Sequence, residues 1–384
     1  MNIFKKFIIR TYQFFLKIGT KFIRFRKPII LNDLKESINY LKEQKVLIII
    51  PSNVSKNQVF EEFISDLQQS KINYQIAYCD IANPTIQLVD EYYSKYQPTL
   101  IMSIGGGSVI DLGKLLAVKM TNKKDLRKMR GILKVRRKPI TQIAVPTTSG
   151  SGSEATVAAV VSCDITHEKY PINDPKIVPD YALLESRFTV TLPKHLTSTT
   201  GMDALTHAIE CYLGKANTKD TLENSVSAIK LIFKSLESAY LEPTNLTYRS
   251  NMQKAAYLAG CAFTKGYVGY VHAIAHQLGG LYHTPHGLAN AVLLPYVLEE
   301  YGDSINKKVQ TLGNTLGIVD FDLVCYVKKM NETLEIPKYI EALKEEDFDL
   351  IIKRAKLEAH PLYPVPKLFS DQNFLNILHK ALKR

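Results

Sequence analysis

The sequence predicts an N-terminal α/β domain built on a doubly wound parallel sheet, followed by an all-α C-terminal domain. Up to about residue 187, short apolar runs that end in breakers alternate with helical patterns, which is typical of βαβ units. Beyond that point long helical patterns dominate and strand-like runs are scarce. The chain has 384 residues, 46% of them hydrophobic, and this exceeds the length over which a single core keeps growing.

The elements of the α/β domain follow one another in a regular order. The first is "KVLIIIP" at 45–51, because an unbroken apolar run that ends in proline is typical of a buried strand. A helix "VFEEFISDLQQS", a strand "NYQIAYCDI" and a helix "TIQLVDEYYSKY" come next. Two further strands, "TLIMSIGGGS" and "ITQIAVPTTSGSGSE", run into loops of glycine and hydroxyl residues. Strands that alternate with helices in this way favour a parallel sheet.

The C-terminal domain is predicted from five long helical patterns. They are "TGMDALTHAIECYLG", "TLENSVSAIKLIFKSLESAYL", "YRSNMQKAAYLAGCAFTKG", "VGYVHAIAHQLGG" and "GLANAVLLPYVLEEYG". We therefore expect a basic N-terminal extension at 1–28, a dinucleotide-binding α/β domain at 29–187 and a helical, metal-binding and catalytic domain at 188–384.

The net charge of +12 is concentrated in two segments. Residues 1–30 contain eight Lys or Arg and no acid, and residues 119–138 contain ten bases and one acid, Asp125. Neither segment has the signature of a helix-turn-helix, a zinc finger or an RNA-binding motif, so no nucleic-acid partner is expected. The 119–138 segment is expected to be a solvated face.

The basic N-terminus is too charged to span a bilayer and lacks the cleavage site of a secretory signal. A helix that packs on the body with its charges in water is favoured for residues 1–26. Peripheral contact with an anionic membrane is the alternative, because Phe and Ile alternate with the bases. Five cysteines without a CxxC pair fit neither a disulfide framework nor a thiolate metal site, so a cytoplasmic location is expected.

Two loops are suited to binding phosphate groups. In "IGGGSVIDLGK" (104–114), glycines follow a strand, and Ser108 opens a helix whose free N–H groups face the loop. The motif is neither GxGxxG nor a Walker loop, so a simple strand-to-helix turn is the alternative. A second loop, "PTTSGSGSEAT" (146–156), should lie beside the first, at the carboxyl edge of the sheet.

A cluster of nitrogen and oxygen ligands is expected in the helical domain. Asp203 and His207 are four residues apart, and so are His272 and His276, so each pair lies on one face of a helix. His286 follows a Gly-Gly turn, in a loop. One carboxylate with several imidazoles suits Fe²⁺, Zn²⁺ or Mn²⁺. The alternative for any single histidine is a hydrogen-bonded core residue.

A phosphate-binding loop and a metal site together fit two classes of reaction. In one, the metal polarises an alcohol or carbonyl oxygen while hydride passes to or from a nicotinamide. In the other, the metal activates water against a phosphorylated substrate. The residues alone leave this choice open.

The sequence resembles the iron-containing (group III) alcohol dehydrogenases. "GGGSVIDLGK", "PTTSGSGSE", "GMDALTHAIE" and "VHAIAHQLGGLYHTPHGLANAVLLP" match the motifs of that family in its order. The resemblance extends from about residue 45 to "YPVPK" at 363–367. It implies a dinucleotide-binding domain, a helical metal-binding domain and NAD(P)-dependent interconversion of a small-molecule alcohol with its aldehyde or ketone. A non-redox metal enzyme of the related synthase type is the alternative, as is a membrane-surface binding protein on the same scaffold.

The resemblance also implies roles for individual residues. The family's metal ligands fall on Asp203, His207, His272 and His286, with Fe²⁺ favoured over Zn²⁺. His276 falls near the nicotinamide, with a role in proton relay or cofactor positioning, and His283 matches no functional position. The cofactor-binding positions are Gly105, Gly106, Gly107, Ser108, Asp111, Thr147, Thr148, Ser151 and Lys169. A homo-oligomer, a dimer in particular, is expected.

One departure from the family concerns the choice between NAD and NADP. Many NAD-preferring members carry an Asp after the first strand, where its carboxylate binds the ribose 2′-hydroxyl and repels a 2′-phosphate. Here Pro51, Ser52 and Asn53 occupy that place, which favours NADPH.

Overall fold

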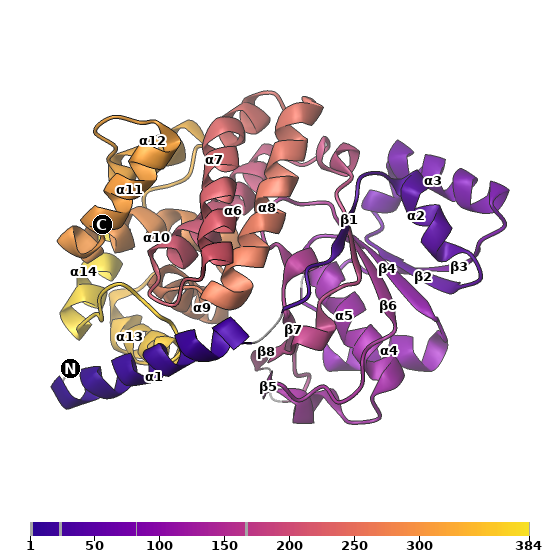
Figure 1. The fold of residues 1–384 in the computed structure, drawn as a ribbon, viewed down its shortest axis with the longest axis horizontal. Helices are drawn as coiled ribbons and strands as arrows, with labels where there is room; N and C mark the ends of the chain where they lie inside the picture. The colour runs from indigo at the N-terminus through magenta and orange to yellow at the C-terminus, as the bar shows by residue number, and fades with distance from the viewer. Residues whose placement is uncertain (1–2, 23–24, 82, 166–167, 384) are drawn as a thin grey trace. The chain divides into compact units, whose positions relative to one another are not determined.

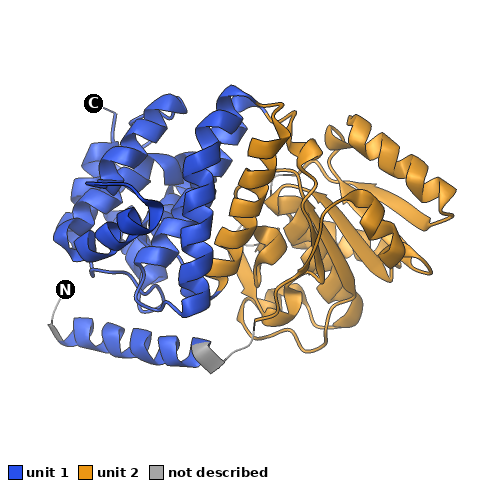
Figure 2. Cartoon of the chain, turned by 45° about the horizontal axis from the view of Figure 1, so that its top comes forward, with its two compact units in different colours: residues 1–24, 193–242, 265–384 blue, residues 25–192, 243–264 orange. Residues whose placement is uncertain are grey.

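The computed structural model describes residues 3–22, 25–81, 83–165 and 168–383. It forms two compact units (Figure 2), and the chain passes more than once between them. Unit 1 comprises residues 1–24, 193–242 and 265–384, and unit 2 comprises residues 25–192 and 243–264. The predicted domain boundaries at residues 28 and 187 stay a prediction. The two units are defined by which segments pack together, whereas a domain is defined by its ability to fold alone.

Unit 2 contains a parallel six-stranded sheet in the order β1-β9-β6-β4-β2-β3, which confirms the predicted fold class. The strand order reverses between β2 and β4, and open α/β sheets bind ligands at such a point, outside the carboxyl ends of the strands. The strands are β1 (Ile29–Leu31), β2 (Lys45–Ile50), β3 (Asn73–Tyr78), β4 (Leu100–Gly105), β6 (Thr141–Pro146) and β9 (Tyr181–Leu183).

Both faces of this sheet are buried, because helices pack on each of them. Successive side chains of a strand point to opposite faces and so enter different clusters. In β2, Leu47 and Ile49 pack into one apolar cluster with side chains of α4 and α5. Val46, Ile48 and Ile50 pack into another cluster with side chains of α2 and α3. Figure 1 shows these helix pairs on either side of the strands. The helices are α2 (Leu34–Leu41), α3 (Gln58–Gln69), α4 (Ile86–Lys95) and α5 (Gly107–Thr121).

A second, three-stranded sheet was not predicted. Its strands are β5 (Gly131–Ile132), β7 (Ala158–Ser162) and β8 (Lys169–Asn173). They are short, and only alternate residues of β7 and β8 are buried, so no continuous apolar run marks them in the sequence. Helix α8 (Leu246–Gly266) also contributes to unit 2.

Unit 1 is helical, as expected for the C-terminal part of the chain, and also contains α1 (Ile3–Phe22) from the N-terminus. Every residue of α6 from Gly201 to Leu213 is buried. A helix that is buried all round lies at the centre of its unit. The remaining helices are α6 (Lys194–Leu213), α7 (Lys219–Leu241), α9 (Tyr270–Tyr282), α10 (His286–Tyr301), α11 (Asn306–Leu316), α12 (Leu323–Thr333), α13 (Phe348–Ala359) and α14 (Asp371–Ala381). Among the described residues, no helix combines the length and the apolar character that crossing a bilayer requires.

Candidate active site

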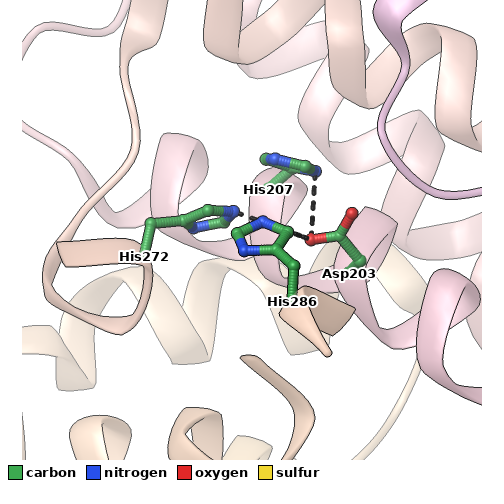
Figure 3. Close-up of side chains that lie close together, drawn as sticks. All are labelled: Asp203, His207, His272 and His286. Atoms are coloured by element: carbon green, nitrogen blue, oxygen red, sulfur yellow. Dashed lines mark ion pairs between the residues drawn. The ribbon is translucent and has the colours of Figure 1, made fainter. Parts of the chain in front are cut away.

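Four side chains from three helices of unit 1 converge on one point (Figure 3). Asp203 and His207 come from successive turns of α6, His272 comes from the first turn of α9, and His286 is the first residue of α10. The Oδ1 atom of Asp203 lies 3.9 Å from Nδ1 of His207, 3.7 Å from Nε2 of His272 and 3.4 Å from Nε2 of His286. The structure therefore brings together the four residues predicted as metal ligands.

The placement of His286 differs from the prediction. Gly279 and Gly280 do not form a turn but lie inside α9, and the chain turns at His283, which adopts a left-handed conformation with φ of 55°. His286 then begins a helix and is not in a loop. Glycine pairs suggest turns, but here the packing of α9 outweighs their weak helix propensity. His283 is exposed, in agreement with its lack of a predicted role.

The donor set fits a divalent metal ion. Ligands about 2.1 Å from a metal in tetrahedral geometry lie roughly 3.4 Å from one another. The distances from Asp203 Oδ1, 3.4 to 3.9 Å, are close to this value. Three imidazoles and one carboxylate without a thiolate suit Fe²⁺ and Zn²⁺ alike.

Electrostatics favour an ionised carboxylate at this point. Burial alone would raise the pKa of Asp203, but the imidazoles of His207, His286 and His272 hold it well below its usual range. Burial alone would likewise lower the pKa of His272, whereas the neighbouring carboxylates of Asp203 and Glu210 raise it to about 9. Asp203 is therefore ionised among the three imidazoles, which is the form of a carboxylate that binds a cation.

Glu210 orients His272, a role that was not among the predictions from the sequence. Its Oε2 atom lies 2.6 Å from Nδ1 of His272, and its two oxygens also accept hydrogen bonds from the backbone N–H groups of Gly269 and Val271, both at 2.7 Å. A neutral His272 that donates Nδ1–H to this carboxylate presents the lone pair of Nε2 to a metal ion held among the four side chains. The signal was available, because Glu210 is seven residues after Asp203 and so lies on the same face of α6.

His276 is held by a second carboxylate, which was also missed. Its Nδ1 lies 2.6 Å from Oε1 of Glu358 on α13, and Glu358 also accepts hydrogen bonds from Tyr363 (2.8 Å) and Gln277 (2.9 Å). The ring of His276 stacks on that of His286, with centroids 5.2 Å apart. His276 is therefore next to the cluster of four but faces a different carboxylate, and its role in proton relay or cofactor positioning stays a prediction.

The two predicted phosphate-binding loops adjoin in unit 2, at the carboxyl ends of β4 and β6. The backbone N–H of Thr147 donates to the carbonyl of Gly105 at 3.0 Å. A Cβ atom on Gly107 would lie 2.7 Å from Oγ and 3.0 Å from Cβ of Ser151, so the side chain of Ser151 would have to shift to admit one. A Cβ on Gly106 would lie 3.6 Å from Thr148. Helix α5 begins at Gly107, and Ser108 is in its first turn, so the N-terminal end of the helix meets the loop as expected.

Asp111 and Lys114 on α5 bind the protein's own backbone. Asp111 accepts hydrogen bonds from Oγ of Ser153 at 2.5 Å and from the N–H of Val160 at 2.9 Å. Burial lowers the pKa of Lys114 to about 8, and its Nζ donates to carbonyls of Thr156 and Ala158. These contacts anchor the segment after the second loop. The predicted contact of Asp111 with the cofactor stays a prediction.

Lys169 and the 119–138 segment also belong to unit 2. Lys169 is the first residue of β8, and its Nζ donates to Asn83 at 2.6 Å. The basic 119–138 segment starts at the C-terminal end of α5, opposite the end that meets the glycine loop. Most of its bases are at least partly exposed, as predicted for a solvated face.

Comparison with known proteins identifies relatives along nearly the whole chain. Residues 23–186 match the family model described as iron-containing alcohol dehydrogenase, and residues 197–382 match the C-terminal model of the Fe-containing alcohol dehydrogenase family. Alcohol dehydrogenase 4 of Saccharomyces cerevisiae is 32% identical to this chain over 362 residues. The matched region covers 91% of this chain and 94% of the yeast protein. The NADPH-dependent butanol dehydrogenase of Clostridium saccharobutylicum is 32% identical, covering 83% and 87%.

The fold has close counterparts among solved structures. An alcohol dehydrogenase from Oenococcus oeni superimposes with a TM-score of 0.86 at 31% identity, covering 93% of this chain and 99% of its own. These likenesses decide between the two reaction classes that the residues left open. The chain belongs to the iron-containing alcohol dehydrogenase family and is an NAD(P)-dependent oxidoreductase that interconverts an alcohol with its aldehyde or ketone.

Proposed function

We propose that Asp203, His207, His272 and His286 hold the metal on which the dehydrogenase reaction depends, with Fe²⁺ favoured over Zn²⁺. The observation that carries this proposal is the convergence of one carboxylate and three imidazoles on a point inside unit 1. When bound, the metal acts as a Lewis acid on the substrate oxygen and the nicotinamide accepts or supplies the hydride. Glu210 orients His272, and Glu358 holds His276 for proton relay or cofactor positioning.

The cofactor sites form the second part of the proposal. Gly105, Gly106, Gly107 and Ser108 bind the pyrophosphate at the start of α5, with Thr147, Thr148 and Ser151 beside them. Asp111 and Lys169 complete the predicted set, Lys169 towards the nicotinamide ribose. The adjoining loops in unit 2 support this arrangement.

An activity panel tests the enzymatic proposal. The metal-free protein is loaded anaerobically with Fe²⁺ or Zn²⁺ and mixed with short-chain and long-chain alcohols and aldehydes, while the nicotinamide absorbance is followed. Turnover is expected only with a metal and a nicotinamide together, and faster with Fe²⁺. Equal turnover in the metal-free protein would contradict the assignment of the four ligands.

We propose further that NADPH is preferred to NADH, because neutral Ser52 and Asn53 follow β2 where NAD-preferring relatives carry an acid. Ser52 contacts a carboxylate, that of Asp80, which follows β3. Its two oxygens accept hydrogen bonds from the N–H and Oγ–H of Ser52, at 2.7 and 2.6 Å, and these bonds lower its pKa. We expect a larger kcat/KM with NADPH than with NADH.

The variant Asp80→Ala gives this prediction its control. If the carboxylate of Asp80 only holds Ser52, its loss should change kcat/KM for both cofactors alike. A preference for NADH in the unmodified protein that is lost in Asp80→Ala would contradict the proposal, and would assign to Asp80 the role of the missing acid.

A cytoplasmic homodimer is proposed as the working form of the enzyme. The five cysteines are all thiols and four of them are buried, which supports a reducing compartment.

We also propose a second role for residues 1–26, peripheral contact with an anionic membrane surface. Helix α1 has two distinct faces. One is anchored to unit 1: Ile9 and Gln13 are buried, Gln13 donates to the carbonyl of Tyr363 at 2.6 Å, and Arg10 donates to the carbonyls of Val365 and Pro366.

The other face of α1 is apolar and exposed. Phe7, Phe14 and Phe15 are 60 to 68% exposed, and their spacing of seven and eight residues places them along one side of the helix. Lys5 and Lys6 are exposed beside them, and residues 1–30 contain no acid. An apolar stripe flanked by bases is the pattern of a helix that lies in the interface of anionic lipid. A second copy of this chain, equally basic here, would be repelled.

A triple variant, Phe7→Ser with Phe14→Ser and Phe15→Ser, tests this role while leaving the anchored face unchanged. The unmodified protein should float with phosphatidylglycerol vesicles and not with phosphatidylcholine vesicles, and the triple variant should float with neither. Leu357→Ser, on an exposed apolar residue of α13, is the control and should float normally. A triple variant that instead turns a dimer into a monomer would show that this face binds a second copy, and would contradict the membrane role.

A further inference from the structure

The side chain of Asn290 is directed at the candidate metal site. It lies on α10, one helical turn after His286, and is fully buried. Its Nδ2 atom lies 2.7 Å from Oδ1 of Asp203, 3.2 Å from Nε2 of His272 and 3.1 Å from Nε2 of His286. The amide nitrogen therefore contacts the ligand atoms of three of the four candidate ligands.

A buried amide in this position has a cost that packing does not explain. The Oδ1 atom of Asn290 has no hydrogen-bond partner among the residues that the structure describes. Leaving a buried acceptor unsatisfied is destabilising, and a leucine of similar size would avoid that cost. The reason for an amide at this position is therefore sought in the contacts of its nitrogen with Asp203, His272 and His286.

Of the three contacts, the one with Asp203 is the strongest. It is the shortest, and its acceptor is an ionised carboxylate, which makes a stronger hydrogen bond than a neutral acceptor does. The terminal torsion of an aspartate has a broad energy minimum, so the carboxylate of Asp203 needs a partner that fixes its rotation. A hydrogen bond to one lone pair of Oδ1 leaves the other for a metal.

We propose that Asn290 is a positioning residue that sets the metal affinity of the site by fixing the carboxylate of Asp203. This inference rests on the proposed assignment of Asp203, His207, His272 and His286 as metal ligands. Asn290 is itself no ligand in this arrangement, because an amide nitrogen carries no lone pair suited to a metal.

Asn290→Leu tests the proposal by removing the donor while keeping the volume. Metal affinity is measured by competition with a chromophoric chelator for Zn²⁺ and Co²⁺, and the visible spectrum of the Co²⁺-loaded protein reports the number of ligands. Affinity should fall by roughly 10–100-fold, as expected for loss of a partner behind a ligand. The intensity of the Co²⁺ bands should stay unchanged, because the four ligands remain.

Asn331→Leu is the matched control. Asn331 on α12 is another buried asparagine that packs against α10: its Nδ2 donates to the carbonyl of Ala291 at 2.8 Å, and its Oδ1 also has no hydrogen-bond partner among the described residues. This variant should lose stability without losing metal affinity. Unchanged affinity in Asn290→Leu, or an equal loss in both variants, would overturn the positioning role. A change in Co²⁺ band intensity would overturn it too, since Asn290 would then be a direct ligand. An unmodified protein that binds no metal would instead refute the proposed ligand set.

Discussion

Replacing His272 by alanine is expected to remove the bound metal and the dehydrogenase activity together. His272 is only 2% exposed, and its Nε2 is aligned by the short contact between Nδ1 and Glu210. The variant loses one of four ligands and leaves the carboxylate of Glu210 without its imidazole. Because a metal supplies several kcal/mol of transition-state stabilisation, kcat/KM should fall on the order of 100-fold or more. Metal content per chain, measured by mass spectrometry, should fall in parallel.

His195→Ala provides the control for this prediction. His195 lies near the start of α6, the helix that also carries Asp203 and His207, but it is exposed and outside the cluster. Its replacement should change neither metal content nor activity. If His272→Ala kept one metal per chain, His272 would not be a ligand, whatever the effect on activity.

Replacing Gly152 by alanine is expected to destabilise unit 2 strongly. Gly152 has a left-handed φ of 59°, and a Cβ atom there would lie 2.7 Å from the carbonyl oxygen of Ala256 and 2.8 Å from Cα of Gly260. The conformational cost and the steric cost add up to something on the order of 2–5 kcal/mol. The free energy of unfolding in urea measures the loss.

Gly317→Ala separates the two costs. Gly317 ends α11 with a left-handed φ of 73°, and a Cβ atom there would meet nothing within 4 Å. It should cost roughly 1–2 kcal/mol, the conformational part alone. If Gly152→Ala were no more destabilising than Gly317→Ala, the second loop and α8 could separate without cost, and the close approach of Gly152 to Gly260 would not hold the loop in place.

The local part of the candidate site was predictable from spacing. Asp203 and His207 share a face of α6 because they are four residues apart. The glycines after β4 mark a tight turn between that strand and α5. Local rules failed where packing overrides a local preference. Gly279 and Gly280 suggested a turn, yet they continue α9 and His286 begins a helix.

The sequence by itself determined the fold class, the two loops and the helix faces shared by Asp203 with His207 and by His272 with His276, because helix and strand periodicity and glycine chemistry act over a few residues. Only the tertiary structure decided which groups surround those residues. Glu358 meets His276 across 82 positions of the chain, and Asn290 meets Asp203 across 87. Such partners depend on how separate helices pack, and nothing in the local pattern encodes that packing. The same holds for α1, whose anchored face is defined by contacts with residues 363–366 at the far end of the chain.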